Sequence, residues 1–265
     1  MVKKAEPKFK ITPCISGSMI NGEYCTFEEQ RLDKVTFPKS FDGTLVIPAG
    51  VTQLGKYLCE DKQEIKEVVL PEGIKSLGIC AFKNCINLVR INMPSSLQFL
   101  GESCFEGCHS LEELSFPANI YLYGTDLVGV SSDTRVSIDT TNTNFFIEDN
   151  VIYSDGGSRL VRLLSDVEDY TIKDGIKTIG AGAFMGLKQL KSITIPQGAE
   201  DIQQYAFYGC KQLESILISD TVVTYGMNMF NGCTNLKSIS VTAKQADVLK
   251  GKLNEEMQEL LVIRQ

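Results

Sequence analysis

A 23-residue step runs through this chain and constrains its fold more than any other feature. The octapeptide AFKNCINL at 81–88 returns as CFEGCHSL, AFMGLKQL, AFYGCKQL and MFNGCTNL further along. Its phenylalanines, in two groups spaced by 23 residues, are Phe82 and Phe105, then Phe184, Phe207 and Phe230. A fixed period between about 20 and 50 residues marks a solenoid, in which each repeat buries its apolar face against its neighbours. We therefore predict that these rings stack in interior rows.

One repeat combines two short extended segments. In LKSITIP at 190–196, Leu190, Ile193 and Ile195 are apolar, and the last two alternate as a half-buried strand requires. Proline then ends the strand, because it has no N–H to donate to the sheet. A turn and a second extended segment such as GIKTIG at 175–180 follow. A short helical segment around each AF is expected to complete the coil.

This repeat resembles that of the BspA-like branch of the leucine-rich-repeat family, which runs roughly L-x-x-I-x-I-P-x-x-V-x-x-I-G-x-x-A-F-x-x-C-x-x-L. The segment LKSITIPQGAEDIQQYAFYGCKQL at 190–213 fits almost every position. The resemblance covers roughly 32–242. It implies an α/β fold: a leucine-rich-repeat solenoid with a parallel strand sheet on the concave side, and short strands and helical turns on the other faces.

We expect one repeat domain over 1–265, with caps at its two ends. Residues 1–31 lack the repeat and form the expected N-terminal cap, while 243–265 form the C-terminal cap. The repeats fill 32–242, where LDKVTFP looks like a first strand before a shortened coil. An irregular repeat occupies 118–169.

Two segments outside the regular repeats have patterns of their own. FFIEDNVIYSDGGSRLVRLL at 145–164 predicts a strand, a Ser-Asp-Gly-Gly turn and a second strand. Thr242 and Gln245 form a capping box at the start of an apolar stripe with helical spacing. We therefore predict a capping helix from 243 to about 258, broken near Gly251, with a last extended segment after it.

Cysteine recurs beside the phenylalanine, and its position decides between a packing role and a chemical one. Cys85, Cys108, Cys210 and Cys233 occupy the same place in their repeats, and Leu187 occupies it in another. A position that accepts leucine is used for apolar bulk and a weak S–H donor. We predict that these cysteines are buried, reduced and free of metal.

Three other interpretations of the cysteines stay open as alternatives: zinc binding, a disulfide and a thiol nucleophile. Cys80, Cys85, Cys104 and Cys108 have nearly the spacing of a structural zinc site. Nine cysteines cannot all pair within one chain, and Cys14 with Cys25 is the best disulfide candidate if the protein is secreted.

A thiol nucleophile would need a base, and His109 is the only histidine. It directly follows Cys108, so the two side chains tend to diverge, and an exposed loop histidine is the simpler interpretation.

Charge and apolar patterning exclude several classes of protein. With 26 basic and 33 acidic residues the net charge is -7, which argues against electrostatic binding to nucleic acid or to an anionic membrane. The longest apolar runs are far too short to span a bilayer. No Walker-type or dinucleotide glycine pattern occurs, so no cofactor is expected. The start MVKKAEPKFK lacks the apolar stretch of a signal peptide, so we expect any leader to lie ahead of residue 1.

Strand residues that point away from the core form the candidate binding surface. In the C-terminal half these are nearly all Ser and Thr, as on any solvated sheet, whereas the N-terminal half mixes charge and apolar groups. The candidate residues are Glu67, Val69, Arg90, Asn92, Glu113 and Ser115. Arg90 is the expected anchor, because arginine is enriched among binding hot spots.

The resemblance implies a non-enzymatic binding module of a surface or secreted protein, acting in adhesion. Its partner would be a protein or carbohydrate, including host macromolecules, and the chain would be a monomer that does not insert into a membrane. Two alternatives remain: a cytoplasmic scaffold of the same fold, and a zinc or thiol protein that uses the cysteines.

Overall fold

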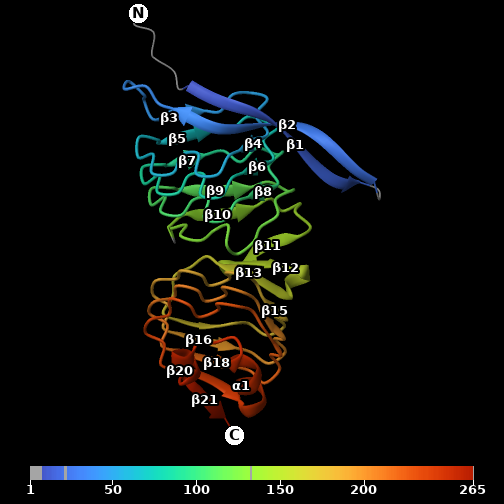
Figure 1. Ribbon diagram of the computed structural model, residues 1–265, viewed down its shortest axis with the longest axis vertical. Helices are drawn as coiled ribbons and strands as arrows, with labels where there is room; N and C mark the ends of the chain where they lie inside the picture. Colours follow the sequence, from blue (N-terminus) through green and yellow to red (C-terminus); the bar gives the residue numbers. More distant parts are fainter. Residues whose placement is uncertain (1–7, 21–22, 132, 265) are drawn as a thin grey trace, which may run out of the picture. The chain divides into compact units, whose positions relative to one another are not determined.

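The protein is described by a computed structural model that covers residues 8–20, 23–131 and 133–264, with only the backbone described at 9 and 11–29. It divides into two compact units, which are described separately (Figure 1). Unit 1 comprises Met1–Leu122 and Gly129–Thr143, and unit 2 comprises Tyr123–Val128 and Asn144–Gln265. The predicted single domain stays a prediction.

Unit 1 is a solenoid with a strand surface on two of its sides. The strands of the first side are β3 (Thr44–Val46), β5 (Glu67–Val69), β7 (Arg90–Ile91), β9 (Glu113–Phe116) and β10 (Arg135–Ile138). Those of the second side are β1 (Lys8–Ile20), β2 (Glu23–Thr36), β4 (Gln53–Leu54), β6 (Ser76–Leu77) and β8 (Phe99–Leu100). The pairs β3–β5–β7, β9–β10 and β2–β4–β6–β8 are parallel, and only the β1–β2 hairpin is antiparallel among these described strands.

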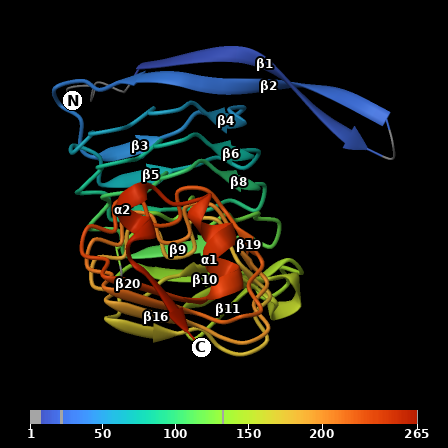
Figure 2. The same ribbon diagram turned by 60° about the horizontal axis from the view of Figure 1, so that its bottom comes forward.

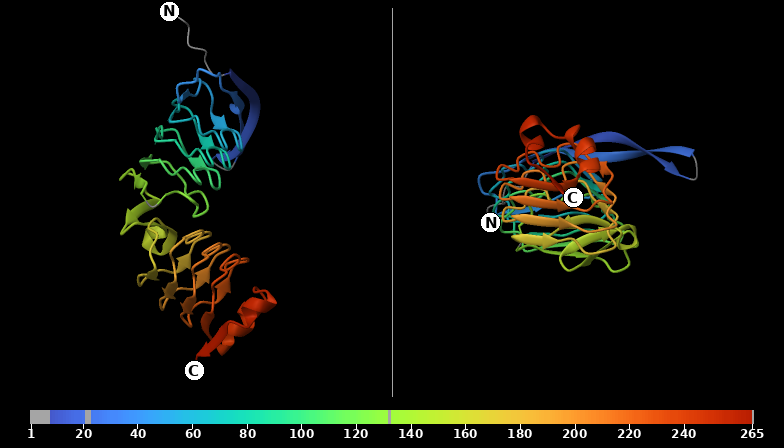
Figure 3. Two further views of the ribbon diagram at one scale, coloured as in Figure 1. Left: turned by 90° about the vertical axis from the view of Figure 1, so that its left-hand side faces the viewer. Right: turned by 90° about the horizontal axis from the view of Figure 1, so that it is seen from below.

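Unit 2 repeats this plan (Figure 3). Its first side carries β14 (Asp169–Thr171), β16 (Ser192–Ile195), β18 (Ser215–Ile218), β20 (Ser238–Thr242) and β21 (Leu261–Arg264). Its second side carries β11 (Phe145–Glu148), β12 (Val151–Ser154), β13 (Arg159–Leu163), β15 (Thr178–Ile179), β17 (Asp201–Ile202) and β19 (Thr224–Tyr225). Its helices are a 3-10 turn at Asp155–Gly157, α1 (Ala243–Lys250) and α2 (Glu255–Gln258). The predicted fold class, a parallel-stranded repeat solenoid, is confirmed.

The recurring phenylalanines lie inside both units. In unit 1 the rings of Phe82 and Phe105 stack with centroids 5.7 Å apart and planes 4° from parallel. In unit 2, Phe207 lies between Phe184 and Phe230, at centroid distances of 5.3 and 5.5 Å. All five side chains are buried. The rings thus continue from coil to coil as the backbone strands do, at nearly the spacing of neighbouring strands, about 4.8 Å.

The segments around AF are turns, and the predicted short helices there are wrong. In the coil that carries Phe82, Cys80 and Asn84 have φ values of 52° and 57°. Left-handed residues cannot continue a right-handed helix. Every second backbone N–H group instead bonds the next coil, as when Phe82 N donates to Cys104 O over 3.0 Å, while the groups between them donate to the carbonyl three residues back. Hydrogen bonds between coils therefore replace those within a helix.

Glycines that follow the second strand are required by the close approach of successive coils. A Cβ on Gly78 would lie 2.4 Å from the carbonyl oxygen of Gly55, and one on Gly101 would lie 2.2 Å from the nitrogen of Ile79. No side chain fits at these distances. The row of glycines therefore leaves a strip of bare backbone along the second side of unit 1.

The irregular repeat contains two hairpins rather than one. Asp149 and Asn150 both have positive φ, at 49° and 60°. Consecutive left-handed residues form the tight turn of a two-residue hairpin, so the long first strand predicted over this segment is split into β11 and β12. The predicted Ser-Asp-Gly-Gly turn is confirmed, and it joins β12 to β13.

The strand that contains most of LDKVTFP joins the second side of unit 1, and not the sheet that contains β3, β5 and β7. Arg31 and Leu32 of β2 pair in parallel with Gln53 and Leu54 of β4. The rest of β2 pairs with β1 in a hairpin that extends beyond the short strands (Figure 2).

The hairpin register separates the two cysteines proposed as a disulfide. Cys14 lies opposite Glu29, and Cys25 lies opposite Ser18, four residues away along the strand. The side chains of Cys14 and Cys25 are outside the described residues.

The C-terminal cap has the predicted helix start and break. Thr242 accepts a hydrogen bond from Gln245 N, and the Gln245 side chain accepts one from Thr242 N over 2.9 Å, which completes the capping box. Helix α1 ends at Lys250 with Gly251 as its C-cap, so the break predicted near Gly251 is confirmed. Gln245 Nε2 also donates to the carbonyl oxygens of Ser219 and Val222, over 2.5 and 3.1 Å. The helix is therefore attached to the last coils through its own cap.

Candidate binding surfaces

The recurring cysteines donate hydrogen bonds between coils. Each Sγ lies 3.0 or 3.1 Å from the carbonyl oxygen of the residue 26 positions earlier. The donor and acceptor pairs are Cys85 to Cys59, Cys108 to Phe82, Cys210 to Phe184 and Cys233 to Phe207. The thiol therefore fills the core and gives a donor to a backbone carbonyl. Leu187, at the same position of its repeat, fills the core but has no polar hydrogen to donate.

Burial makes these thiols poor nucleophiles and poor metal ligands. Desolvation raises the pKa of Cys59, Cys108 and Cys233 to about 12 and that of Cys210 to about 11. Both roles need the thiolate, which such pKa values disfavour at neutral pH. In the described part of the chain no three His, Cys, Asp or Glu side chains are grouped to hold a metal. His109 is exposed in its loop.

The first side of unit 1 carries a row of alternating charges. Thr44, Glu67 and Arg90 are cross-strand neighbours on β3, β5 and β7, and Glu113 faces Arg135 on β9 and β10. Arg135 Nη2 lies 2.9 Å from Glu113 Oε2, and Arg90 Nε lies 3.6 Å from Glu112 Oε2. Because the Arg90 side chain is 73% exposed, its ion pair is worth little in water. This guanidinium can therefore exchange Glu112 for an acidic group of a partner.

A second row lies beside the charges and begins with two apolar side chains. Val46 and Val69 are paired on β3 and β5 and are 55% and 37% exposed. Asn92 follows them, but its amide accepts from Leu70 N over 2.7 Å and donates to Leu70 O over 2.9 Å. Asn92 therefore extends the backbone pairing where β5 ends. Because its amide is already used in these two bonds, it has less hydrogen-bonding capacity for a partner.

The remaining predicted residues lie at the other end of this surface. Ser115 is exposed and accepts a hydrogen bond from Ser137 over 3.0 Å, and its hydroxyl donates to Glu113. Glu113 is only half-buried, and its hydrogen bond from Ser115, with Arg135 second, lowers its pKa. Arg135 was missed because the register of 118–169 was unknown from sequence. The alternation in RVSI at 135–138 was the signal for it.

The first side of unit 2 is mostly polar and has fewer charged side chains on its strands than the first side of unit 1. Its outward residues include Asp169, Thr171, Ser192, Thr194, Ser215, Leu217, Ser238, Ser240 and Val262. Ion pairs lie next to this surface between Lys191 and Glu168 and between Lys237 and Glu214, over 2.8 and 2.7 Å. Apart from Asp169, Leu217 and Val262, these outward residues have the small hydroxyl side chains of a solvated sheet.

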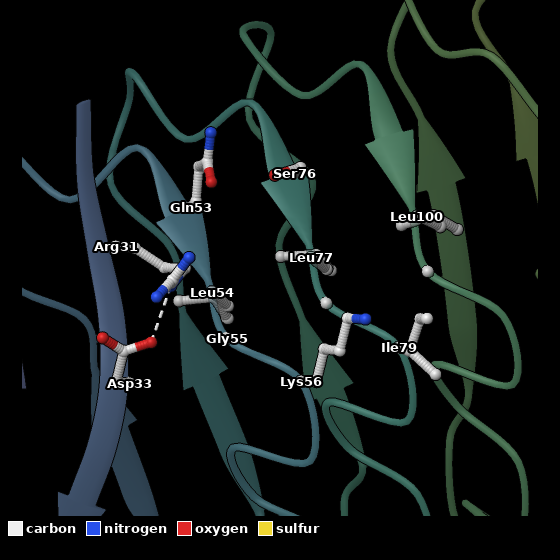
Figure 4. A pocket seen from close by; sticks show the side chains of 12 residues that line it. Arg31, Asp33, Gln53, Leu54, Gly55, Lys56, Ser76, Leu77, Ile79 and Leu100 are labelled. Atoms are coloured by element: carbon white, nitrogen blue, oxygen red, sulfur yellow. Dashed lines mark hydrogen bonds and ion pairs between the residues drawn. The ribbon is translucent and has the colours of Figure 1, made fainter. Parts of the chain in front are cut away.

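The second side of unit 1 contains an open groove that sequence reasoning missed (Figure 4). Its volume is about 550 Å³. Gln53 and Ser76 lie on one side of the glycine row, and Lys56 and Ile79 lie on the other. Arg31 and Asp33 form an ion pair of 2.6 Å at one end. Gln53 and Ser76 each stand two positions before a recurring glycine, and this spacing in the sequence could have identified one wall of the groove.

Stacked coils, parallel strands on two sides and interior rows of phenylalanine define a leucine-rich-repeat protein. A family model described as the BspA type leucine rich repeat region matches 43–155 and 163–253, in six copies. The chain therefore belongs to the BspA-type leucine-rich-repeat family, whose members are generally non-catalytic and often surface-associated. None of the curated protein sequences compared with it matches significantly.

One solved structure of a bacterial leucine-rich-repeat protein shares the fold, and two others are less similar. A leucine-rich repeat protein from Eubacterium ventriosum is 19% identical, with a TM-score of 0.58, covering 81% of this chain and 68% of its own. The pneumococcal vaccine antigen PcpA is 18% identical, with a TM-score of 0.44, covering 86% and 80%. The T. pallidum leucine rich repeat protein is 18% identical, with a TM-score of 0.40, covering 91% and 94%. Within the described residues, no helix has the length and apolar character needed to cross a membrane.

Proposed function

We propose that this chain is a non-enzymatic binding module that recognises a protein partner through the first side of unit 1. The observation that carries the proposal is the charge row of Glu67, Arg90, Glu113 and Arg135 beside the exposed pair Val46 and Val69. A row of charges beside exposed apolar side chains suits a protein interface, because complementary charges orient the partner and apolar contact stabilises the complex.

The surface has features of recognition and, among the described residues, none of the groupings that catalysis uses. Its carboxylates Glu112 and Glu113 are paired with arginines, and the hydroxyls of Ser115 and Ser137 bond Glu113 or one another. The Ser115 hydroxyl donates to Glu113, but the hydrogen bond and Arg135 lower the pKa of this carboxylate, which makes it a weak base. Following the family resemblance, we place the protein at the cell surface or outside the cell, in adhesion to host or microbial macromolecules, and as a monomer.

Arg90→Glu tests the proposed site. The purified chain is screened against immobilised extracellular-matrix and cell-surface proteins, and the affinity of each protein bound is compared between variants. Arg90→Glu should weaken binding at least about tenfold, about 1.4 kcal/mol, because it replaces a central cation with an anion. The fold should be unaffected, since the Arg90 side chain points to solvent.

Ser238→Glu is the matched control, because it places the same charge on the first side of unit 2. It should leave the affinity unchanged. Equal losses from Arg90→Glu and Ser238→Glu would contradict the proposal. So would a loss from neither, if substitutions in the hairpins at 145–163 abolished binding.

A further inference from the structure

The second side of unit 1 ends in an exposed pair of stacked aromatic rings. Phe99 of β8 and Tyr121 form a parallel bridge, and their ring centroids lie 5.8 Å apart with planes 19° from parallel. The two side chains are 45% and 46% exposed. Large exposed apolar groups that lie together commonly mark a site of interaction. These two lie on a different side of the coils from the charge row.

Tyr121 covers one face of the Phe99 ring, and the small side chain of Ser76, its neighbour on β6, leaves the other face open. The register places Ser76 of β6 beside Phe99, and Gln53 of β4 beside Ser76. Tyr121 stacks against Phe99 at the spacing of one coil, but serine is too small to cover a ring in the same way. The space above Ser76 can therefore hold a flat, partly apolar group against Phe99.

The groove is lined by Gln53 and Ser76 of this row and reaches β8 at Leu100, so that Phe99 flanks its end as the cross-strand neighbour of Ser76. Its floor is the glycine row, where a Cβ on Gly78 or Gly101 would meet backbone at 2.4 or 2.2 Å, so that backbone lies bare at the surface. Gln53 and Ser76 lie along one side of the floor, with the Arg31–Asp33 pair at the end away from Leu100 (Figure 4). The strand order β2–β4–β6–β8 places Phe99, on β8 with Leu100, at the opposite end from this pair. Amide, hydroxyl, guanidinium and carboxylate groups together supply donors and acceptors along its length.

We propose that this groove binds a linear, neutral oligosaccharide. A pyranose ring has an apolar face of C–H groups and a rim of hydroxyls that both donate and accept hydrogen bonds. One ring would stack on the open face of Phe99, and its hydroxyls and those of the next rings would bond Ser76, Gln53 and the Arg31–Asp33 pair. The wall residues recur once per coil, about 4.8 Å apart. Such a repeating wall suits a ligand that itself repeats.

Other occupants fit these residues less well. Strands β4 and β6 are paired on both sides, so the groove gives a peptide no free strand edge for sheet addition. Arg31 is bonded to Asp33, and a chain with a net charge of -7 does not concentrate polyanions. A stacking surface with mixed donors and acceptors matches an uncharged sugar best.

The experiment is a binding screen against neutral oligosaccharides of one to six units. The probes are gluco-, xylo-, manno- and galacto-oligosaccharides and oligomers of N-acetylglucosamine, with titration calorimetry on those that bind. At least one series should bind, and affinity should rise with chain length as more of the groove is filled. Phe99→Ala and Ser76→Phe should each reduce that affinity at least about tenfold, the first by removing the stacking ring and the second by filling its open face.

Two controls separate this site from the rest of the molecule. Tyr208→Ala removes an exposed aromatic side chain from unit 2, and Arg90→Glu alters the proposed protein site. Both should keep full sugar affinity. If Phe99→Ala lowers the unfolding midpoint, Ser76→Phe decides, because it leaves the stacked aromatic pair in place. Absence of binding to every series at millimolar concentration would overturn the proposal, and so would sugar binding that Ser76→Phe leaves intact. Neither result would affect the test of the protein site by Arg90→Glu.

Discussion

Replacing Phe207 with alanine should strongly destabilise unit 2, because this side chain occupies the middle of its interior row. Phe207 is 0% exposed, and its ring stacks on both neighbours, Phe184 and Phe230. Replacing a buried phenylalanine ring with a cavity costs roughly 3 to 5 kcal/mol. Because the substitution removes stacking on both faces of the ring, the expected decrease in unfolding free energy lies in the upper part of that range, at about 4 to 5 kcal/mol.

The position of Phe207 in the row matters as well as its burial. Each coil of a solenoid is stabilised only by its own packing and by its two neighbours, so a defect in the middle weakens two interfaces. Phe230, with Phe207 as its stacked partner in the row, should cost less when replaced by alanine. A larger decrease in unfolding free energy for Phe207→Ala than for Phe230→Ala would therefore show that stacking along the row contributes to stability in addition to burial.

The measurement is urea unfolding followed by far-UV and near-UV circular dichroism, on the parent, Phe207→Ala and Phe230→Ala. Tyr208→Ala is the matched control, since it removes the adjacent aromatic side chain, which is 39% exposed. That control should cost less than about 1 kcal/mol. A decrease below about 1 kcal/mol for Phe207→Ala would refute the reasoning, because it would mean that the ring is not in a packed interior row.

Two further predictions concern the thiols and the glycine row. Burial raises the pKa of the Cys210 thiol from 9.0 to about 11. The stability of the folded state is therefore fully present below pH 9, where the unfolded thiol is still protonated, and is lost as the pH rises from 9 towards 11, because the unfolded thiol ionises first. Unfolding free energies measured from pH 8 to 11 should therefore fall more steeply for the parent than for Cys210→Val, and parallel curves would contradict this. Gly78→Ala should cost about 1 to 3 kcal/mol in the same assay because its Cβ would lie 2.4 Å from Gly55 O. Gly251→Ala should lower the unfolding free energy much less, because its Cβ would lie 3.7 Å from its nearest neighbour. If Gly78→Ala cost as little as Gly251→Ala, neighbouring coils could move apart to admit the added Cβ, and the prediction would be wrong.

The repeated features were those that sequence could predict. A residue that returns every 23 positions reports the same environment several times, so the burial of Phe82 or Phe207 did not depend on one local pattern. Capping at Thr242 was predictable for another reason, because the Thr and Gln of a capping box satisfy specific backbone groups.

Local backbone conformation was harder to predict. The AF segments have the composition of short helices, and only the positive φ of residues such as Cys80 and Asn84 turns them into loops. Those conformations are imposed by hydrogen bonds to the next coil, which no single segment encodes. The Asp149–Asn150 turn, by contrast, carried a recognisable signal, since both residue types tolerate left-handed conformations.

The candidate surfaces were predicted only where alternation in a strand was visible. Glu67, Val69 and Arg90 followed directly from it. The double hydrogen bond of Asn92 to Leu70 depends on the end of a neighbouring strand, which sequence does not place. The groove was missed because its second strands have only two residues each, too few to show a period.

Arg162 shows how a solenoid coil can be completed where the repeat is interrupted. In a regular coil of unit 2, Tyr208 O accepts the N–H of Gly186 from the coil before it, over 2.8 Å. Met185 O is the equivalent atom one coil earlier, and there the chain makes the β12–β13 hairpin instead of a regular coil. The buried guanidinium of Arg162 fills the gap, because its Nη1 donates to Met185 O over 2.9 Å and to Gly182 O over 2.8 Å. Burial lowers the pKa of Arg162 to about 10, which still leaves it protonated at pH 7. One side chain thus supplies a hydrogen bond that the repeat supplies elsewhere from the backbone, and this is why a break in the sequence period does not leave the first regular coil of unit 2 with an unsatisfied carbonyl.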